Sequence, residues 1–140
     1  MIRILVFNAH PRYRRRRRRT QEAVRTVLRS EQCRQAELAV IFVNDRTMRA
    51  LNTTYLNHRF PTDVLSFPLS PPSAPALEGE VYVNLDQARR QAPRFDATFR
   101  REIDRLVIHG TLHLLGYDDR SSRDRSRMTK AEERYLQRIA

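Results

Sequence analysis

Cysteine and long apolar runs are scarce in this sequence, and their scarcity excludes several classes of protein. The 140 residues include a single cysteine, Cys33, so an internal disulfide bond is impossible and a disulfide-stapled miniprotein is excluded. The longest apolar run, residues 38–43, is far shorter than the roughly 20 residues of a transmembrane helix. The apolar N-terminal segment is too short for a secretion signal and lacks a small-residue cleavage site. We expect a cytoplasmic protein that does not enter a membrane.

Lysine is nearly absent, although the chain is strongly basic. The sequence has 27 lysines and arginines against 16 aspartates and glutamates, a formal net charge of +11, and Lys130 is its only lysine. Excess positive charge attracts polyanions, of which nucleic acid is the default candidate. Arginine also forms paired hydrogen bonds with phosphates and stacks on bases. Codon usage biased toward arginine is an alternative origin of this composition, and it leaves the physical consequence unchanged.

An uninterrupted run of arginines occupies residues 14–19. Adjacent like charges repel one another, so such a run is typical of a flexible loop or of a solvated helix start. The functional alternative is an arm that contacts the phosphates of a nucleic acid. Both interpretations stay open at this point.

The pattern of apolar residues predicts one α+β domain over residues 1–140. A chain of this length buries roughly two-thirds of its unfolded surface, which is enough for one core. Strands are expected at residues 2–7, 36–44, 63–69 and 80–83. Helices are expected after Thr20, at residues 45–54, from Asn84 or Asp86 to about Ala92, and at residues 99–115 and 122–139. This order predicts a four-stranded mixed sheet covered by about five helices, with a metal-binding helix in the C-terminal half.

Three residues are expected to mark the ends of these elements. Thr20 is predicted to be the N-cap of the first helix. Pro68 favours an edge position or a strand end for residues 63–69. Gly116 is predicted to end the helix at residues 99–115 as its C′ residue.

Two histidines four residues apart lie in the most apolar of the expected helices. His109 and His113 share one helix face, so their ring nitrogens can converge on one ion. Gly116 then ends the helix, and the chain can turn and bring Asp119 back toward the same face. Two imidazoles and a carboxylate leave a fourth position open for water, which is the arrangement of a catalytic zinc site. We therefore predict one Zn²⁺ held by His109, His113 and Asp119.

Chance spacing is the alternative explanation, because surface and core histidines are common. The neighbouring residues are apolar, however, among them Leu106 and Leu112, and imidazoles buried there need polar partners. A shared metal ion supplies such a partner. The HExxH motif of zinc peptidases requires a glutamate directly after the first histidine as general base. Gly110 occupies that position, which argues against a peptidase mechanism.

These residues resemble a known family. The segment HGTLHLLGYDD, residues 109–119, is similar to the HGxLHLxGYDH signature of the bacterial YbeY family of single-strand-specific endoribonucleases and rRNA maturation factors. A second block, Leu51-Asn52 with Tyr55 and PTDVLSFP at residues 61–68, resembles the family's LNxxYR…PTDVLSFP segment. A weaker match is GEVYV at residues 79–83. The blocks occur in the family's order and span most of the chain.

The resemblance implies both a fold and an activity. It implies an α+β fold, a zinc ion held by three residues, and endonucleolytic cleavage of single-stranded RNA. It also implies a role in rRNA maturation, notably 3′-end processing of 16S rRNA, in ribosome quality control, and in association with the small ribosomal subunit. Thr62 and Asp63 are expected to line the cleft, although turn chemistry alone also explains them. We expect a monomer.

Two positions depart from the family pattern. The third ligand is usually histidine and is Asp119 here, and a carboxylate oxygen binds zinc at nearly the same distance, so the site should survive. Its neighbour Asp118 is expected to support that ligand or to compete with it. The family's arginine after the tyrosine falls on Leu56. His58 and Arg59 are the candidates to replace it as catalytic residues.

Two other functions stay under consideration, and the missing arginine motivates the first of them. The first is a non-catalytic RNA-binding ribosome assembly factor with a structural metal. The second is a metallohydrolase that acts on a substrate other than RNA, such as a peptide, and Gly110 disfavours it.

Overall fold

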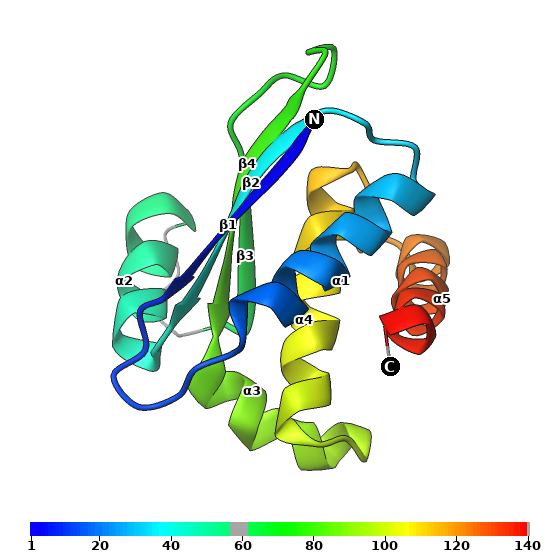
Figure 1. Ribbon diagram of the computed structural model, residues 1–140. Coiled ribbons are helices and arrows are strands. Elements are labelled where there is room, and N and C mark those ends of the chain that lie inside the picture. The colour runs from blue at the N-terminus through cyan, green and yellow to red at the C-terminus, as the bar shows by residue number, and fades with distance from the viewer. Residues whose placement is uncertain (57–61, 140) are drawn as a thin grey trace.

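Four strands form one mixed sheet in the computed structural model, which describes residues 1–56 and 62–139 (Figure 1). Strands β1 (Ile2–Asn8), β2 (Ala36–Val43) and β4 (Leu77–Asn84) run parallel, and the edge strand β3 (Val64–Pro68) is antiparallel to β4. The order across the sheet is β1-β2-β4-β3. The predicted α+β fold with a four-stranded mixed sheet is therefore confirmed, and Pro68 ends the edge strand as expected.

Helices cover both faces of this sheet. They are α1 (Arg17–Ser30), α2 (Asp45–Leu56), α3 (Leu85–Gln91), the 3₁₀ turn η1 (Ala92–Phe95), α4 (Phe99–Leu114) and α5 (Ser122–Ile139). Helices α1 and α4 lie against one face, α5 packs on their outer side, and α2 lies on the opposite face (Figure 1). No helix in the described ranges is long and apolar enough to cross a membrane.

The main core lies between the sheet and the layer formed by α1 and α4. Alternate residues of the two central strands are fully buried, among them Leu38, Val40, Val81 and Val83. Each such side chain contributes about 1.5–3 kcal/mol when it leaves water. Helix α4 packs directly on β3 and β4, so this core holds the histidine-bearing helix against the edge strand.

Helix α1 begins earlier than the sequence suggested, so the prediction of Thr20 as its N-cap is wrong. Arg16 is the N-cap, and Thr20 is buried inside the helix. Arginine is a good helix former, so half of the arginine run extends the helix. Asp104 of α4 also forms ion pairs with Arg15 at 2.9 Å and Arg19 at 3.6 Å, which reduces charge repulsion at the start of the helix.

Strand β4 also begins earlier than predicted, at Leu77 rather than Glu80. Gly79 lies inside the strand because α4 approaches it closely. A Cβ atom at Gly79 would lie 2.9 Å from both Cδ atoms of Leu114. Glycine here permits close packing and does not mark the end of the preceding loop.

Candidate metal centre

Helix α4 places His109 and His113 one turn apart on the same side. Thr98 caps the helix, because its side chain accepts a hydrogen bond from the backbone nitrogen of Arg101 at 3.1 Å. The two imidazole rings lie with their centroids 4.8 Å apart and their planes at 75°. Rings in this arrangement can direct one nitrogen each toward a common point.

A Schellman motif at the end of α4 returns the chain to these histidines. The backbone nitrogen of Gly116 donates to the carbonyl of His113, and that of Tyr117 donates to the carbonyl of Leu112, both at 3.0 Å. Gly116 has a φ of 101°, a conformation that glycine adopts without strain. The prediction of Gly116 as the C′ residue is confirmed.

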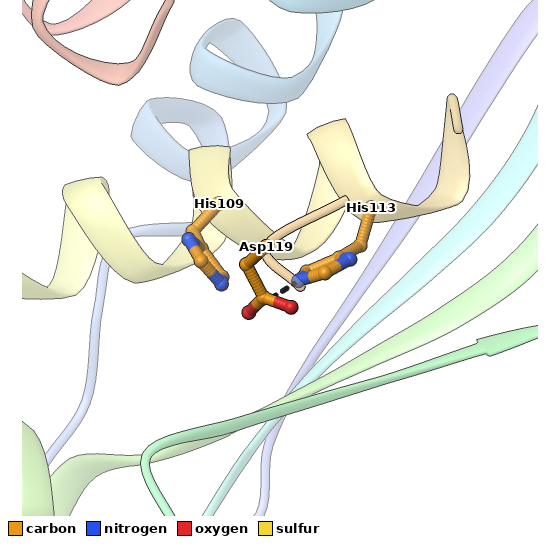
Figure 2. A group of neighbouring side chains, drawn as sticks. All are labelled: His109, His113 and Asp119. Atoms are coloured by element: carbon orange, nitrogen blue, oxygen red, sulfur yellow. Dashed lines mark ion pairs between the residues drawn. The ribbon is translucent and has the colours of Figure 1, made fainter. Parts of the chain in front are cut away.

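The reversal brings Asp119 against both histidines, as Figure 2 shows. Its Oδ2 lies 3.4 Å from Nε2 of His113, and ligand atoms of His109, His113 and Asp119 all lie within 4.8 Å of one another. Two imidazole nitrogens and one carboxylate oxygen form a donor set that suits zinc and other divalent transition metals. The residues predicted from spacing are therefore brought together in space.

Glu132 of α5 supports this group from behind. Its Oε2 lies 2.6 Å from Nδ1 of His109, and its side chain is almost fully buried. A carboxylate accepts hydrogen bonds, so Nδ1 carries the proton and Nε2 keeps its lone pair free for a ligand. Metal-binding histidines almost always have such a partner on the other ring nitrogen. The environment of His109 thus fits a bound metal ion.

A chain of polar side chains connects Glu132 to the opposite wall of the cleft. Arg105 donates hydrogen bonds to Glu132 at 3.2 Å and to Glu102 at 2.7 Å. Burial alone would lower the pKa of the Arg105 guanidinium, but the bonds and charges of these two carboxylates outweigh it and raise that pKa. Gln91 then joins Glu102 to Asp63, to which it donates at 3.1 Å. This chain of side chains thus contains three carboxylates, two of them on the Arg105 guanidinium and the third at Asp63, and this excess of acidic groups favours a cation nearby.

The three candidate ligands open onto a cleft of about 370 Å³ between α4 and β3. Thr62, Asp63 and Ser66 line its other wall. The side chains of His109 and His113 are 20% and 28% exposed, so an ion held there would be within reach of a substrate. An open metal position of this kind is typical of catalytic sites rather than structural ones.

Gly110 explains why the site lacks the glutamate of zinc peptidases. A Cβ atom at this position would lie 2.4 Å from Cγ1 of Val81 and 3.2 Å from Oγ of Ser66. The Ser66 hydroxyl donates a hydrogen bond to the Gly110 carbonyl at 2.8 Å, which ties β3 to α4. A glutamate side chain has no room here. The absence of the glutamate base, which argues against a peptidase, therefore has a steric reason.

The other predicted site residues have different outcomes. His58 and Arg59 lie outside the described residues, so their catalytic role stays a prediction. Leu56 ends α2 and is 46% exposed, without the guanidinium that the family has at this position. Asp118 is not part of the group of converging ligand atoms; its Oδ1 accepts a hydrogen bond from the backbone nitrogen of Asp119 at 2.7 Å, and its Oδ2 lies 3.6 Å from Nε of Arg120.

Glu132 is the member of this site that the sequence interpretation missed. The signal was present in α5, where a carboxylate occurs among residues of the buried face such as Met128 and Tyr135. A charged group on an apolar helix face needs a polar partner, so this pattern predicts that Glu132 contacts a polar group of another element.

The amino-acid sequence of this chain is similar to that of known proteins. A sequence model of the family described as "Endoribonuclease YbeY" matches residues 8–140. The chain is 44% identical to "Endoribonuclease YbeY" of Chlorobium luteolum over 117 residues, which are 84% of this chain and 84% of that protein. It is 39% identical to the protein of the same name from Chloroherpeton thalassium over 116 residues, 83% of this chain and 81% of the relative.

A solved structure is similar along almost the whole chain. It is a solution structure of a protein from Thermotoga maritima, with a TM-score of 0.66 and 27% sequence identity. The match covers 99% of this chain and 89% of that one. Sequence and fold agree, and the chain belongs to the endoribonuclease YbeY family.

Proposed function

We propose that this protein is a zinc-dependent endoribonuclease that cleaves single-stranded RNA. The observation that carries the proposal is the convergence of ligand atoms from His109, His113 and Asp119 within 4.8 Å at the wall of an open cleft. Membership of the endoribonuclease family supplies the substrate class. Imidazole ligands favour zinc over magnesium or calcium, and a carboxylate completes a set of three.

The residues of the chain have separate tasks in this proposal. His109, His113 and Asp119 would hold the ion, which when bound supplies Lewis-acid catalysis of phosphodiester hydrolysis. Glu132 fixes the tautomer and the orientation of the His109 ring through its contact with Nδ1. Gly110 and Ser66 keep α4 close to β3 and so set the width of the cleft.

We further propose that the RNA is ribosomal. The 3′ end of 16S rRNA and the small ribosomal subunit are the expected substrate and partner, with a role in ribosome quality control. We propose that one Zn²⁺ binds per chain and that the protein acts as a cytoplasmic monomer. Co-sedimentation of the protein with purified small subunits tests the partner, and sedimentation velocity tests the oligomeric state.

An RNA cleavage assay tests the central activity. Zinc-loaded wild-type protein is incubated with end-labelled single-stranded RNA, beside His113→Ala and beside a double-stranded RNA of the same sequence. We expect internal cuts only in the single strand, lost in His113→Ala while its circular dichroism spectrum remains that of wild type. Intact single-stranded RNA with zinc-loaded wild type, in conditions where the Chlorobium luteolum relative cleaves it, would contradict the proposal.

The second candidate function is a non-catalytic RNA-binding assembly factor with a structural metal. The observation that favours it is Leu56, which is exposed where the family has an arginine. A structural ion holds the fold together, so His113→Ala would then unfold or melt well below wild type. A folded His113→Ala that has lost only cleavage excludes this alternative.

A further inference from the structure

A basic groove lies where the N-terminal ends of α1 and α4 meet, outside the metal cleft. It has a volume of about 1130 Å³ and is lined by Arg14 to Arg19 with Arg100 and Arg101. Glu22 and Asp104 are its acidic members. Eight arginines against two carboxylates leave a formal charge of +6 in one concave surface. Such concentrated positive charge attracts a polyanion over a distance of about 10 Å at 0.1 M salt.

Two of these arginines hold the groove in shape. Asp104 is buried, and both of its oxygens accept hydrogen bonds from Arg15, at 2.9 to 3.1 Å. Arg19 lies 3.6 Å from the same carboxylate. Because Asp104 belongs to α4 and the arginines to the start of α1, this cluster fixes one helix end against the other.

The other arginines of the groove have no such role. Their side chains are exposed, and none makes an ion pair or a side-chain hydrogen bond with the described part of the protein; they are Arg14, Arg16, Arg17, Arg18, Arg100 and Arg101. Each guanidinium therefore offers its full set of donors to a ligand.

The arginines at the start of α1 lower the stability of the fold. Arginines fill the first turn of α1, which contains no acidic residue. The N-terminus of a helix carries a partial positive charge, so cations there cost stability and anions are favoured. Charge that opposes stability and has no internal partner indicates a site for an external anion.

The groove and the metal centre both include residues of α4. Arg101, Arg105, His109 and His113 follow one another at intervals of four residues, so they form one ridge of the helix. Arg101 lies about 12 Å along the helix axis from His109. Beside this ridge Phe95 is 56% exposed, and its ring packs 4.6 Å from the Arg105 guanidinium. Exposed aromatic rings among arginines provide stacking surfaces for unpaired bases.

We propose that this groove binds the phosphate backbone of the RNA whose scissile bond occupies the metal cleft, an inference that rests on the proposed function for the identity of the RNA. Guanidinium groups match phosphate oxygens with two parallel hydrogen bonds. The ridge leads the strand from the groove past Phe95 to His109. The groove thus extends the contact with substrate beyond the nucleotides at the cleft.

The test compares two double variants that lower the net charge equally. Arg17→Glu with Arg18→Glu changes the groove, and glutamate in the first turn of α1 is favoured by the helix dipole, so the helix should stay folded. Arg46→Glu with Arg49→Glu is the control, because both arginines are exposed on α2, across the sheet from α1 and α4 (Figure 1). Fluorescence anisotropy measures the Kd of a labelled single-stranded RNA in EDTA at several salt concentrations.

We expect the groove variant to bind RNA about tenfold more weakly, with a salt slope smaller by about 1.4, since each lost phosphate contact removes about 0.7. The control should match wild type. Equal Kd and slope for the groove variant and wild type would overturn the proposal.

A polyglutamate peptide of the same charge tests whether the groove is specific for RNA. If it binds wild type as tightly as RNA does, RNA is not the occupant. Binding is measured in EDTA and does not depend on the metal. If zinc-loaded wild type fails to cleave RNA, that result contradicts the proposed function and leaves the binding result unchanged.

Discussion

At the scale of single residues, the candidate metal centre depends on a side chain that is not itself a candidate ligand. Glu132 reaches His109 from α5 and shares its carboxylate with Arg105. Without this acceptor the His109 ring could rotate or exchange tautomers, and Nε2 would face the cleft only part of the time. The precision of the site therefore comes from a second helix.

The first prediction concerns this carboxylate. Glu132→Gln keeps the shape of the side chain but weakens the acceptor at Nδ1 of His109, so zinc affinity should fall by about 10–100-fold. Calorimetric titration with zinc measures the change. Glu133→Gln is the matched control, because Glu133 is the exposed neighbour on the same helix. Equal affinities for the two variants would show that Glu132 has no role in the site.

The second prediction concerns the contact between α4 and the sheet. Gly110→Ala introduces a Cβ atom 2.4 Å from Cγ1 of Val81. Alanine is the better helix former by about 1 kcal/mol, but overpacking of about 1–3 kcal/mol opposes this gain, so the free energy of unfolding should fall. Urea denaturation in EDTA measures it. Val81→Ala should cost less in the Gly110→Ala background than alone, and strict additivity of the two changes would refute the steric explanation.

At the scale of elements, the start of α1 shows where local sequence rules failed. Thr20 is a strong N-cap residue type, yet the helix begins at Arg17. The deciding contacts come from Asp104, which lies 89 residues from Arg15 along the chain. As a result the Thr20 hydroxyl is buried without a hydrogen-bond partner in the described parts of the protein.

A third prediction follows from a matched pair of buried helical threonines. The Thr111 hydroxyl donates to the Val107 carbonyl at 2.8 Å, whereas the Thr20 hydroxyl has no such bond among the described residues. Thr20→Val should raise the free energy of unfolding by about 1 kcal/mol, and Thr111→Val should lower it by a similar amount. Urea denaturation in EDTA compares them, and a loss of stability in both variants would contradict the assignment.

The fourth prediction concerns the ion pair that joins α2 to α3. Hydrogen bonds from Arg90 to Asp45, both at 2.7 Å, hold the pKa of the Asp45 carboxyl below its usual value. A depressed pKa in the folded state stabilises the fold above the unfolded pKa of about 3.9 and loses this effect as the pH falls through the folded value. The free energy of unfolding at pH 7 should therefore be higher for wild type than for Asp45→Asn. The difference should be only about 0.5–1 kcal/mol, because the pair is partly exposed.

Unfolding by urea at several pH values checks the predicted direction of the change in stability with pH. The stability difference between wild type and Asp45→Asn should persist down to about pH 5 and vanish below the folded pKa. A difference that stays constant into strong acid would mean that the Asp45 charge contributes nothing.

At the scale of the whole molecule, the sequence was informative wherever the signal was local. The spacing of His109 and His113, and the glycine that ends their helix, are determined by helix geometry, so the candidate ligands were predictable. The contacts of Glu132 and Asp104 join elements that are distant in the chain, and no local pattern encodes which helices meet. The proposed RNA groove has the same origin, since the arginine run acquires its shape from α4.

The catalytic candidates His58 and Arg59 stay predictions of the sequence alone. They follow Leu56, where the family's arginine is missing, and precede Thr62 at the cleft wall. Substitution of each by alanine, followed by the RNA cleavage assay, decides whether either residue replaces that arginine.

The most direct test of the account is the metal content of the purified protein. Elemental analysis after zinc loading and dialysis is applied to wild type, His109→Ala, Asp119→Ala and Asp118→Ala. We predict about one zinc per chain in wild type and in Asp118→Ala, and a clear loss in the other two variants, because Asp119, and not Asp118, belongs to the group of converging ligand atoms. Wild-type protein without zinc, or full zinc retention in Asp119→Ala, would contradict the three-residue metal centre.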